Sequence, residues 1–394
     1  MKNNTPKLTD TQTLDTARSI LEEHLPLQAQ GYSCHSEHLY EALLAVCASG
    51  ESLEAVCRDL PGTPEAGTVR SYLNEQLTLE ELPALQQHLN RALTAKRPAR
   101  LSRKAQRVAI DFHDRPYYGK APKEKAQWVR GKAKDGTTRF FRIATVYLIR
   151  NGMRMTLALH FVLPDDDTVT VLKSLLKRIN ILEVEIDVLL LDKGFAGIET
   201  MRYLDQEHIP AIIACPIRGK RAPTPGGTRA LCQGRKSYSA QYTFKNSKTS
   251  FTAPLAVCRV FTTARRTGRM KRQAQWLVFI VIGEALPWGS ARSVRRLYQR
   301  RFGVETSYRL SHRVRGWTSG GNAAYRFLLM GLSFFMVNVW VHLCWLYTQV
   351  PRRGGRLLAV ERFRLGRFAQ FILQALQRKY GYVQEILAPA PPLP

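Results

Sequence analysis

The sequence is short of acidic side chains, and those it has are unevenly placed. It contains 31 acidic and 59 basic side chains, which give a formal net charge of +28. After Glu207 the next acid is Glu284, and only Glu305, Glu361 and Glu385 follow. A charge of this size says little about the fold and much about the partner. Nucleic acid is the leading candidate partner, and an anionic membrane is the second.

Two other absences bear on where the protein works. The seven cysteines are an odd number at no spacing typical of a disulfide framework, and the first ten residues, MKNNTPKLTD, hold no apolar signal region. Free thiols and the lack of a secretion signal are typical of a reducing compartment. We therefore expect a cytoplasmic, nucleoid-associated protein.

One long segment lacks charge altogether. Residues 327–347, FLLMGLSFFMVNVWVHLCWLY, contain no Lys, Arg, Asp or Glu, and a segment of 21 residues is long enough to cross a bilayer. The segment nevertheless contains Ser333, Asn338 and His342, and its flanks are basic on both sides, so neither orientation in a membrane is favoured. We expect a buried core helix and no membrane partner. A membrane-associated basic protein is the alternative.

Residues 1–95 carry apolar side chains at helical spacing and predict a helical amino-terminal domain that binds DNA. Within it, residues 52–73 resemble a helix–turn–helix pair, whose second helix offers Thr68, Arg70 and Ser71 to a DNA groove. The same pattern fits an ordinary helical hairpin equally well. Residues 96–107, KRPARLSRKAQR, follow as a basic linker.

Strand-like patterns begin at residue 108. Asn151-Gly152 lies between two apolar runs, which is a strong signal for a hairpin. Three antiparallel strands followed by a helix, a strand, a helix and a strand predict a mixed α/β sheet in residues 108–215. The expected strands cover residues 108–111, 140–149, 155–163, 184–191 and 209–215.

Residues 216–275 interrupt this sheet pattern. They contain no acid and are rich in Lys, Arg, Gly, Ser and Thr, with aromatic residues that give the segment something to pack. We expect a basic, β-rich insertion that faces phosphates; a disordered basic loop is the alternative. Residues 276–350 then complete the α/β domain, and residues 351–394 form a basic helix and tail. The densest basic cluster of the insertion is Arg265, Arg266, Arg269, Lys271 and Arg272.

Residues 290–315 predict one long helix that is dense in arginine and contains a single carboxylate. Tyr298, Arg301 and Glu305 follow the spacing Y-x2-R-x3-E, which places them on one helix face. A lone acid in a basic helix has two explanations. It forms a salt bridge with a neighbouring arginine, or it is a metal ligand beside side chains that hold a polyanion.

Two other acids make the metal explanation attractive. Asp111 and Asp192 each come directly after an apolar run, so we expect them at the ends of neighbouring strands, at the sheet edge where open sheets bind ligands. Together with Glu305 they would form a cluster of three carboxylates that repel one another. A divalent cation relieves this repulsion, and oxygen ligands suit Mg²⁺ or Mn²⁺. Two such ions can cleave a phosphodiester.

Other acids compete for these positions. Asp114 lies three residues after Asp111, Asp187 lies within the strand before Asp192, and Glu284 follows a strand. The acids at residues 165–167 are better explained as a helix cap. For each chosen acid, an edge residue in a salt bridge is the alternative.

The three segments AIDFHDRPYYGK, LLLDKGFAGIE and the Y-x2-R-x3-E helix, in this order, resemble the DDE transposases of bacterial and archaeal insertion sequences. The similarity is to the subclass with the signature Y-x2-R-x3-E-x6-K, and it covers residues 109–331. It implies a ribonuclease H-like catalytic domain with a β-rich insertion before the third acid. Matched residue by residue, it implies that Asp111, Asp192 and Glu305 are the catalytic, metal-binding triad, with Mg²⁺ or Mn²⁺ as two ions.

The resemblance also implies DNA contacts. Tyr298 and Arg301 match signature residues that contact DNA near the cleaved end in that family. The final lysine of the signature would fall at position 312, where this chain has His312, and Arg309 or Arg313 could keep the phosphate contact. The expected activity is cleavage and strand transfer at the ends of a mobile element, by a homodimer on double-stranded DNA. A degenerate, non-catalytic DNA-binding protein is the alternative.

Overall fold

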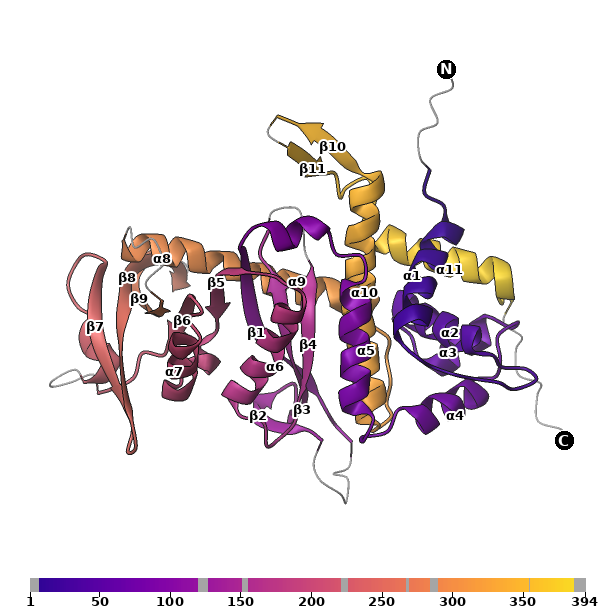
Figure 1. Ribbon diagram of the computed structural model, residues 1–394, viewed down its shortest axis with the longest axis horizontal. Coiled ribbons are helices and arrows are strands. Elements are labelled where there is room, and N and C mark those ends of the chain that lie inside the picture. Colours follow the sequence, from indigo (N-terminus) through magenta and orange to yellow (C-terminus); the bar gives the residue numbers. More distant parts are fainter. Residues whose placement is uncertain are drawn as a thin grey trace.

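The computed structural model describes residues 7–119, 127–150, 155–220, 226–266, 269–283, 290–353 and 355–385. The molecule is elongated, with a helical body at one end, a sheet in the middle, and long β-strands at the other end (Figure 1). The Asn151-Gly152 turn, Glu284 and the tail after residue 385 lie outside the described residues.

The helical body begins with the amino-terminal helices, as the sequence predicts. Thr9 caps the first helix by accepting a hydrogen bond from the backbone N–H of Gln12, whose side chain accepts one from Thr9 in return. The helix–turn–helix-like pair leaves Arg70 and Ser71 exposed. The helices are α1 (Asp10–His24), α2 (Ser36–Ser49), α3 (Leu53–Asp59), α4 (Ala66–Gln76) and α5 (Leu82–Thr94).

The central sheet is mixed, as predicted, and its strands follow the order β2-β3-β1-β5-β6-β9-β8-β7, with β4 paired to the far side of β3. β1 pairs antiparallel with β3 and parallel with β5, and β5 pairs parallel with β6. The crossovers are α6 (Thr168–Ile181), which Asp167 caps, and α7 (Ile198–Gln206). The strands on this side are β1 (Gln106–Pro116), β2 (Val129–Lys134), β3 (Thr137–Leu148), β4 (Thr156–Val162), β5 (Ile186–Leu191) and β6 (Ala211–Cys215).

The segment predicted as a separate insertion extends the same sheet. β7 (Tyr238–Lys245), β8 (Ser250–Arg266) and β9 (Arg269–Ile282) form antiparallel pairs, and β9 pairs with β6. The predicted boundary between residues 275 and 276 therefore falls inside β9. The sequence pattern is misleading here because the outer half of β9, Arg269 to Gln275, is polar and basic, whereas its inner half is apolar and buried.

Residues 290–315 are helical but do not form one uniform α-helix. α8 (Ala291–Tyr298) and α9 (Gly303–Ser311) are joined by the 3₁₀ turn Gln299–Phe302, and a second 3₁₀ turn, His312–Val314, follows. A 3₁₀ turn is wound more tightly than an α-helix, so it changes the angular positions of the side chains that follow it.

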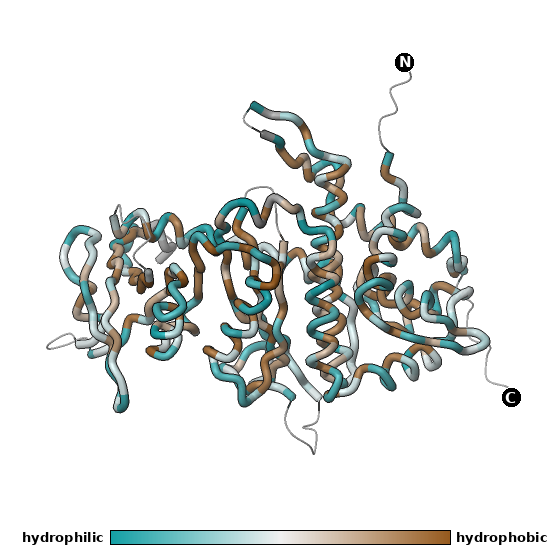
Figure 2. Tube along the Cα trace, in the orientation of Figure 1, coloured by the Kyte–Doolittle hydropathy of each residue, from teal (hydrophilic) through white to brown (hydrophobic). Residues whose placement is uncertain are grey.

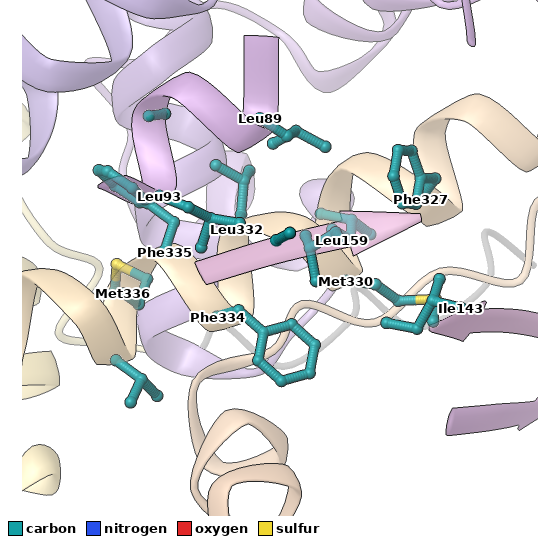
Figure 3. Packing of buried hydrophobic residues seen from close by; sticks show 14 of the residues in the cluster. Leu89, Leu93, Ile143, Leu159, Phe327, Met330, Leu332, Phe334, Phe335 and Met336 are labelled. Carbon is teal, nitrogen blue, oxygen red and sulfur yellow. The ribbon is translucent and has the colours of Figure 1, made fainter. Parts of the chain in front are cut away.

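The uncharged segment forms α10 (Ala323–Tyr347) at the junction of the sheet and the helical body (Figure 1). It is long and apolar enough to cross a membrane, yet 94% of its most apolar window is buried inside the protein. Figure 3 shows its side chains packed with those of α5 and β4, including Phe327, Leu89 and Leu159. The burial agrees with the prediction of a core helix.

Side-chain amides close the outer edge of β4. The Asn90 amide bonds both the N–H and the carbonyl of Leu159, and the Asn338 amide does the same for Thr156. Gln86 accepts from the N–H of Phe161. An edge strand otherwise presents unpaired backbone groups, and here α5 and α10 satisfy them. Hydrophilic and hydrophobic residues alternate along α5 (Figure 2).

The carboxyl-terminal helix returns to the amino-terminal helices. After the hairpin of β10 (Gln349–Arg352) and β11 (Gly355–Leu358), α11 (Leu365–Tyr380) packs against α1 and α2. Its contact is centred on the buried carboxylate of Glu41, which accepts from Arg18 at 3.0 Å, from Lys379 at 2.9 Å and from the Tyr380 hydroxyl. Burying a polar group is costly unless it is hydrogen-bonded, and these contacts supply the partners.

Candidate functional site

Asp111 lies in the middle of β1, and the prediction that it ends a strand is wrong. β1 continues to Pro116 because it pairs with β3 as far as Pro116↔Phe140. Its other neighbour, β5, ends at Leu191, which pairs with Ile110. Asp111 therefore lies where the parallel partner stops, and Asp192 is the next residue after that partner. Since paired strands are about 4.8 Å apart, the two aspartates are neighbours across the end of β5.

The electrostatics of Asp111 reflect this position. Burial raises the pKa of Asp111 to about 6; Arg301 opposes the rise and the nearby Asp192 adds to it. The Arg301 Nη1 atom lies 2.9 Å from Asp111 Oδ2, and the Arg301 side chain is only 10% exposed. Burial alone would lower the pKa of Arg301, but Tyr298, Asp111 and Asp192 outweigh it and raise that pKa. A guanidinium thus occupies the side of Asp111 where a metal ion would add positive charge.

The helical segment of residues 291–311 is tied to this point by two tyrosines. The Tyr298 hydroxyl donates to the carbonyl of Leu191 at 3.2 Å, next to Asp192. The Tyr308 hydroxyl donates to the carbonyl of Asp111 at 3.1 Å and lies 2.8 Å from Thr145 Oγ1. These bonds hold Tyr298 and Arg301, predicted as DNA contacts, inside the protein against the strand ends.

Glu305 lies on this helix between residues that reach Asp111. It follows Arg301 by four positions and precedes Tyr308 by three, but the 3₁₀ turn Gln299–Phe302 separates Arg301 from α9. Its side chain is exposed, however, and the described residues contain no group of three His, Cys, Asp or Glu close enough to hold a metal. The structure brings Asp111 and Asp192 together and leaves Glu305 outside their cluster. The two aspartates offer the hard oxygen ligands that Mg²⁺ and Mn²⁺ prefer.

The competing acids have structural partners. Asp114 accepts from Arg142 at 2.6 and 2.9 Å, which is a bidentate ion pair, and Asp187 accepts from Arg107 at 2.7 Å. Both acids are thus held in ion pairs, and among the chosen acids Asp111 is held in one as well, by Arg301.

The predicted basic residues fall into two places. Arg309 and Arg313 are exposed on the helical segment that follows Arg301. Arg272 is exposed on β9, where its guanidinium lies 4.3 Å from the centre of the Phe261 ring. For the remaining predicted residues of this cluster the structure describes the backbone, which lies at the far ends of β8 and β9, and not the side chains. These residues are Arg265, Arg266, Arg269 and Lys271.

Sequence reasoning missed the rest of the strand face that carries Asp111. Side chains alternate along a strand, so His113 and Arg115 share this face. The His113 ring stacks on Tyr308 at 4.6 Å, and its Nε2 lies 3.2 Å from His312 Nε2. Burial, aided by His312 and Arg315, lowers the pKa of His113 to about 3. The alternation of polar residues at 111, 113 and 115 was the available signal, but it required β1 to continue past Asp111.

The comparisons with known proteins give one family match and one match in fold. A family model described as "Transposase DDE domain" matches residues 102–319. Among solved structures, a "piggyBac transposase synaptic complex with hairpin DNA" resembles the chain with a TM-score of 0.54 at 11% identity, and the match covers 96% of this chain and 82% of that one. The likeness shows the fold, a ribonuclease H-like mixed sheet with added helices. No curated protein matches the chain.

Proposed function

The chain belongs to the DDE-domain transposases, and we propose that it cleaves and rejoins DNA at the ends of a mobile element, with Asp111, Asp192 and Glu305 as its catalytic residues. The observation that carries this proposal is that Asp111 and Asp192 lie side by side at the end of β5, beyond which β1 keeps only β3 as its partner. Two adjacent carboxylates offer hard oxygen donors to a divalent ion, and we propose Glu305, exposed on the neighbouring helical segment, as the third donor.

Within this site the residues of the chain have separate tasks. A divalent ion, Mg²⁺ or Mn²⁺ and two in number, would supply an activated water and charge for the leaving oxygen of a phosphodiester. Asp111 and Asp192 present their oxygens from fixed backbone positions, which limits the reorganisation needed. Arg301 balances the negative charge of Asp111 when no metal is bound. Glu305 joins from the exposed helix face.

The charge of the molecule supports DNA as the partner. Its excess of 28 positive charges suits a polyphosphate, and Arg309, Arg313 and Arg272 are exposed cations. In our proposal α3 and α4 contact the ends of the element, and two copies of the chain act together in the cytoplasm. We also propose that the chain belongs to the subclass with the Y-x2-R-x3-E signature.

The proposal is tested by cleavage of a duplex that carries the inverted repeats flanking the reading frame, in Mg²⁺ or Mn²⁺. We expect Asp111→Asn, Asp192→Asn and Glu305→Gln each to lower the cleavage rate by about 10³-fold or more, because losing even one stabilising group in such sites costs about 10²–10³-fold. Binding of the duplex should persist. Asp187→Asn is the matched control, because that acid is half exposed and bound by Arg107. Normal cleavage by Glu305→Gln would sink the assignment of the third acid.

A second candidate function is DNA binding without cleavage. The exposure of Glu305 and its separation from the two aspartates favour it. The same assay decides, because a binding protein would retain the duplex and leave it intact in both metal ions.

A further inference from the structure

Three arginines line one small pocket on the face of β1 that carries Asp111. Arg115 comes from β1, Arg315 from the residues after the second 3₁₀ turn, and Arg326 from the first turn of α10. Phe141 and Thr318 complete the wall, and the space between them is about 10 Å³, enough for one water-sized group. A nucleobase would not fit, whereas one oxygen of an anion would.

The three guanidiniums have no carboxylate partner. Within the described residues, none of them forms an ion pair with Asp or Glu. The nearest acid in sequence, Asp114, points to the opposite face of β1 and is bound by Arg142. Arg315 Nη1 is buried and has no hydrogen-bond partner. Buried donors without partners are rare in folded proteins, so the hydrogen-bonding capacity of Arg315 is not met within the described residues.

The protein holds one of the three cations, Arg326, in place by direct contacts. Arg326 donates to the carbonyls of Gly320 and Thr318 at 2.6 and 3.3 Å, and its guanidinium lies over the rings of Tyr117 and Phe141 at 5.5 and 5.2 Å. Burial and the neighbouring Arg326 lower the pKa of Arg115 to about 10, and burial and Arg115 do the same for Arg315. All three remain charged near neutral pH, at a cost in mutual repulsion that a bound anion would relieve.

The position of the pocket identifies the anion. Arg115 follows Asp111 by four residues on the same face, a distance of about 13 Å along a strand. Since each DNA strand carries one phosphate per 3.4 Å of helix axis, about 13 Å corresponds to about four nucleotides. His113 and His312 lie between the two points, and both are uncharged near neutral pH because burial and the adjacent arginines lower their pKa values.

We propose that Arg115, Arg315 and Arg326 form a binding site for a single backbone phosphate of DNA, within about four nucleotides of the bond that is cut. A planar guanidinium donates in the fork geometry that matches phosphate oxygens. This inference rests on the proposed function, because that function identifies the bound polyanion as the DNA strand that is cut. Its test measures binding and does not require cleavage.

The test measures binding without metal, by fluorescence anisotropy, to the flanking-repeat duplex with a neutral methylphosphonate at one position at a time. For the wild-type protein we expect one position near the cleaved bond at which the substitution raises Kd about tenfold. In Arg115→Gln the Kd should be raised for every duplex, and that position should show no additional loss, since the two changes remove the same contact. Arg91→Gln, which replaces an exposed arginine on α5, is the control. Its Kd should rise at the same methylphosphonate position as that of the wild type.

Losses that add at every position in Arg115→Gln would overturn the proposal. Should this variant fail to fold, Arg315→Gln is measured in the same way, and additive losses there overturn it equally. If the wild-type protein cuts no DNA, but its sensitive position disappears in Arg115→Gln, the phosphate site is supported and the proposed cleavage is wrong. The salt dependence gives a second readout, since loss of one phosphate contact should reduce the slope of log K against log salt by about 0.9 in Arg115→Gln.

Discussion

The two faces of β1 do different work although their residues alternate along one strand. On one face Phe112 stacks on Phe195 with ring centres 4.7 Å apart, and Asp114 forms its bidentate ion pair with Arg142. Each polar group on this face has its partner within the protein. The other face carries Asp111, His113 and Arg115. Asp111 lies beside Asp192, and Arg115 lies beside two further arginines that have no carboxylate partner among the described residues. The first face maintains the fold, and we propose that the second binds a metal ion and DNA.

The largest stability change should come from removing the cation that holds the paired aspartates. Arg301→Gln leaves Asp111 and Asp192 side by side without positive charge, and breaking a buried ion pair costs about 3 kcal/mol. We expect Mn²⁺ to restore much of this loss, measured by urea unfolding with and without the ion. Arg142→Gln is the matched control, because it breaks the ion pair on the opposite face. Rescue of both variants to the same extent would contradict a metal site confined to the Asp111 face.

A smaller loss is expected from the face that maintains the fold. Phe112→Ala removes a half-buried ring from its stack on Phe195 and should lower the free energy of unfolding by about 2 kcal/mol, less than for a fully buried ring. The effect should be the same with and without Mn²⁺, since no proposed ligand is touched. Dependence on the metal would show that the two faces are not separate.

The ion pair on that face should matter less still. Asp114→Asn weakens the bidentate contact with Arg142, in which both side chains are about one quarter to one third exposed, and solvent screens such pairs. We expect a loss of about 1 kcal/mol in unfolding free energy and unchanged cleavage of the flanking-repeat duplex. A loss of cleavage comparable to that of Asp111→Asn would place Asp114 in the site.

The smallest change tests the position where the signature lysine is absent. His312→Lys adds a charge on the Asp111 face beside Arg315 and Arg115 and removes the contact with His113. We expect a loss of no more than about 0.5 kcal/mol in stability, as for an exposed position. The slope of DNA binding against salt should steepen by about 0.9 for the added phosphate contact. An unchanged slope would mean that DNA does not reach His312.

Much of this arrangement could be predicted from the sequence, and the failures have physical reasons. The β5–Asp192 junction was predictable because a buried strand reads as a continuous apolar run that ends at the acid. β1 was predicted too short because its second half is polar: it crosses the site, and pairing with β3 rather than burial keeps it extended. Residue spacing does not reveal the 3₁₀ turn between Arg301 and α9, so the helix face predicted for Glu305 assumed a regular α-helix. The arginine pocket is assembled from three distant segments, so no local pattern indicates it.

The central claim is that a divalent ion binds at the Asp111 face and not at the Asp114 face. Titration of metal-free protein with Mn²⁺, followed by the loss of the free-ion signal in electron paramagnetic resonance, tests it directly. We predict saturable binding by the wild-type protein and by Asp114→Asn, and loss of that binding in Asp111→Asn and Asp192→Asn. Wild-type binding in Asp111→Asn, with the variant shown to be folded, would contradict the claim.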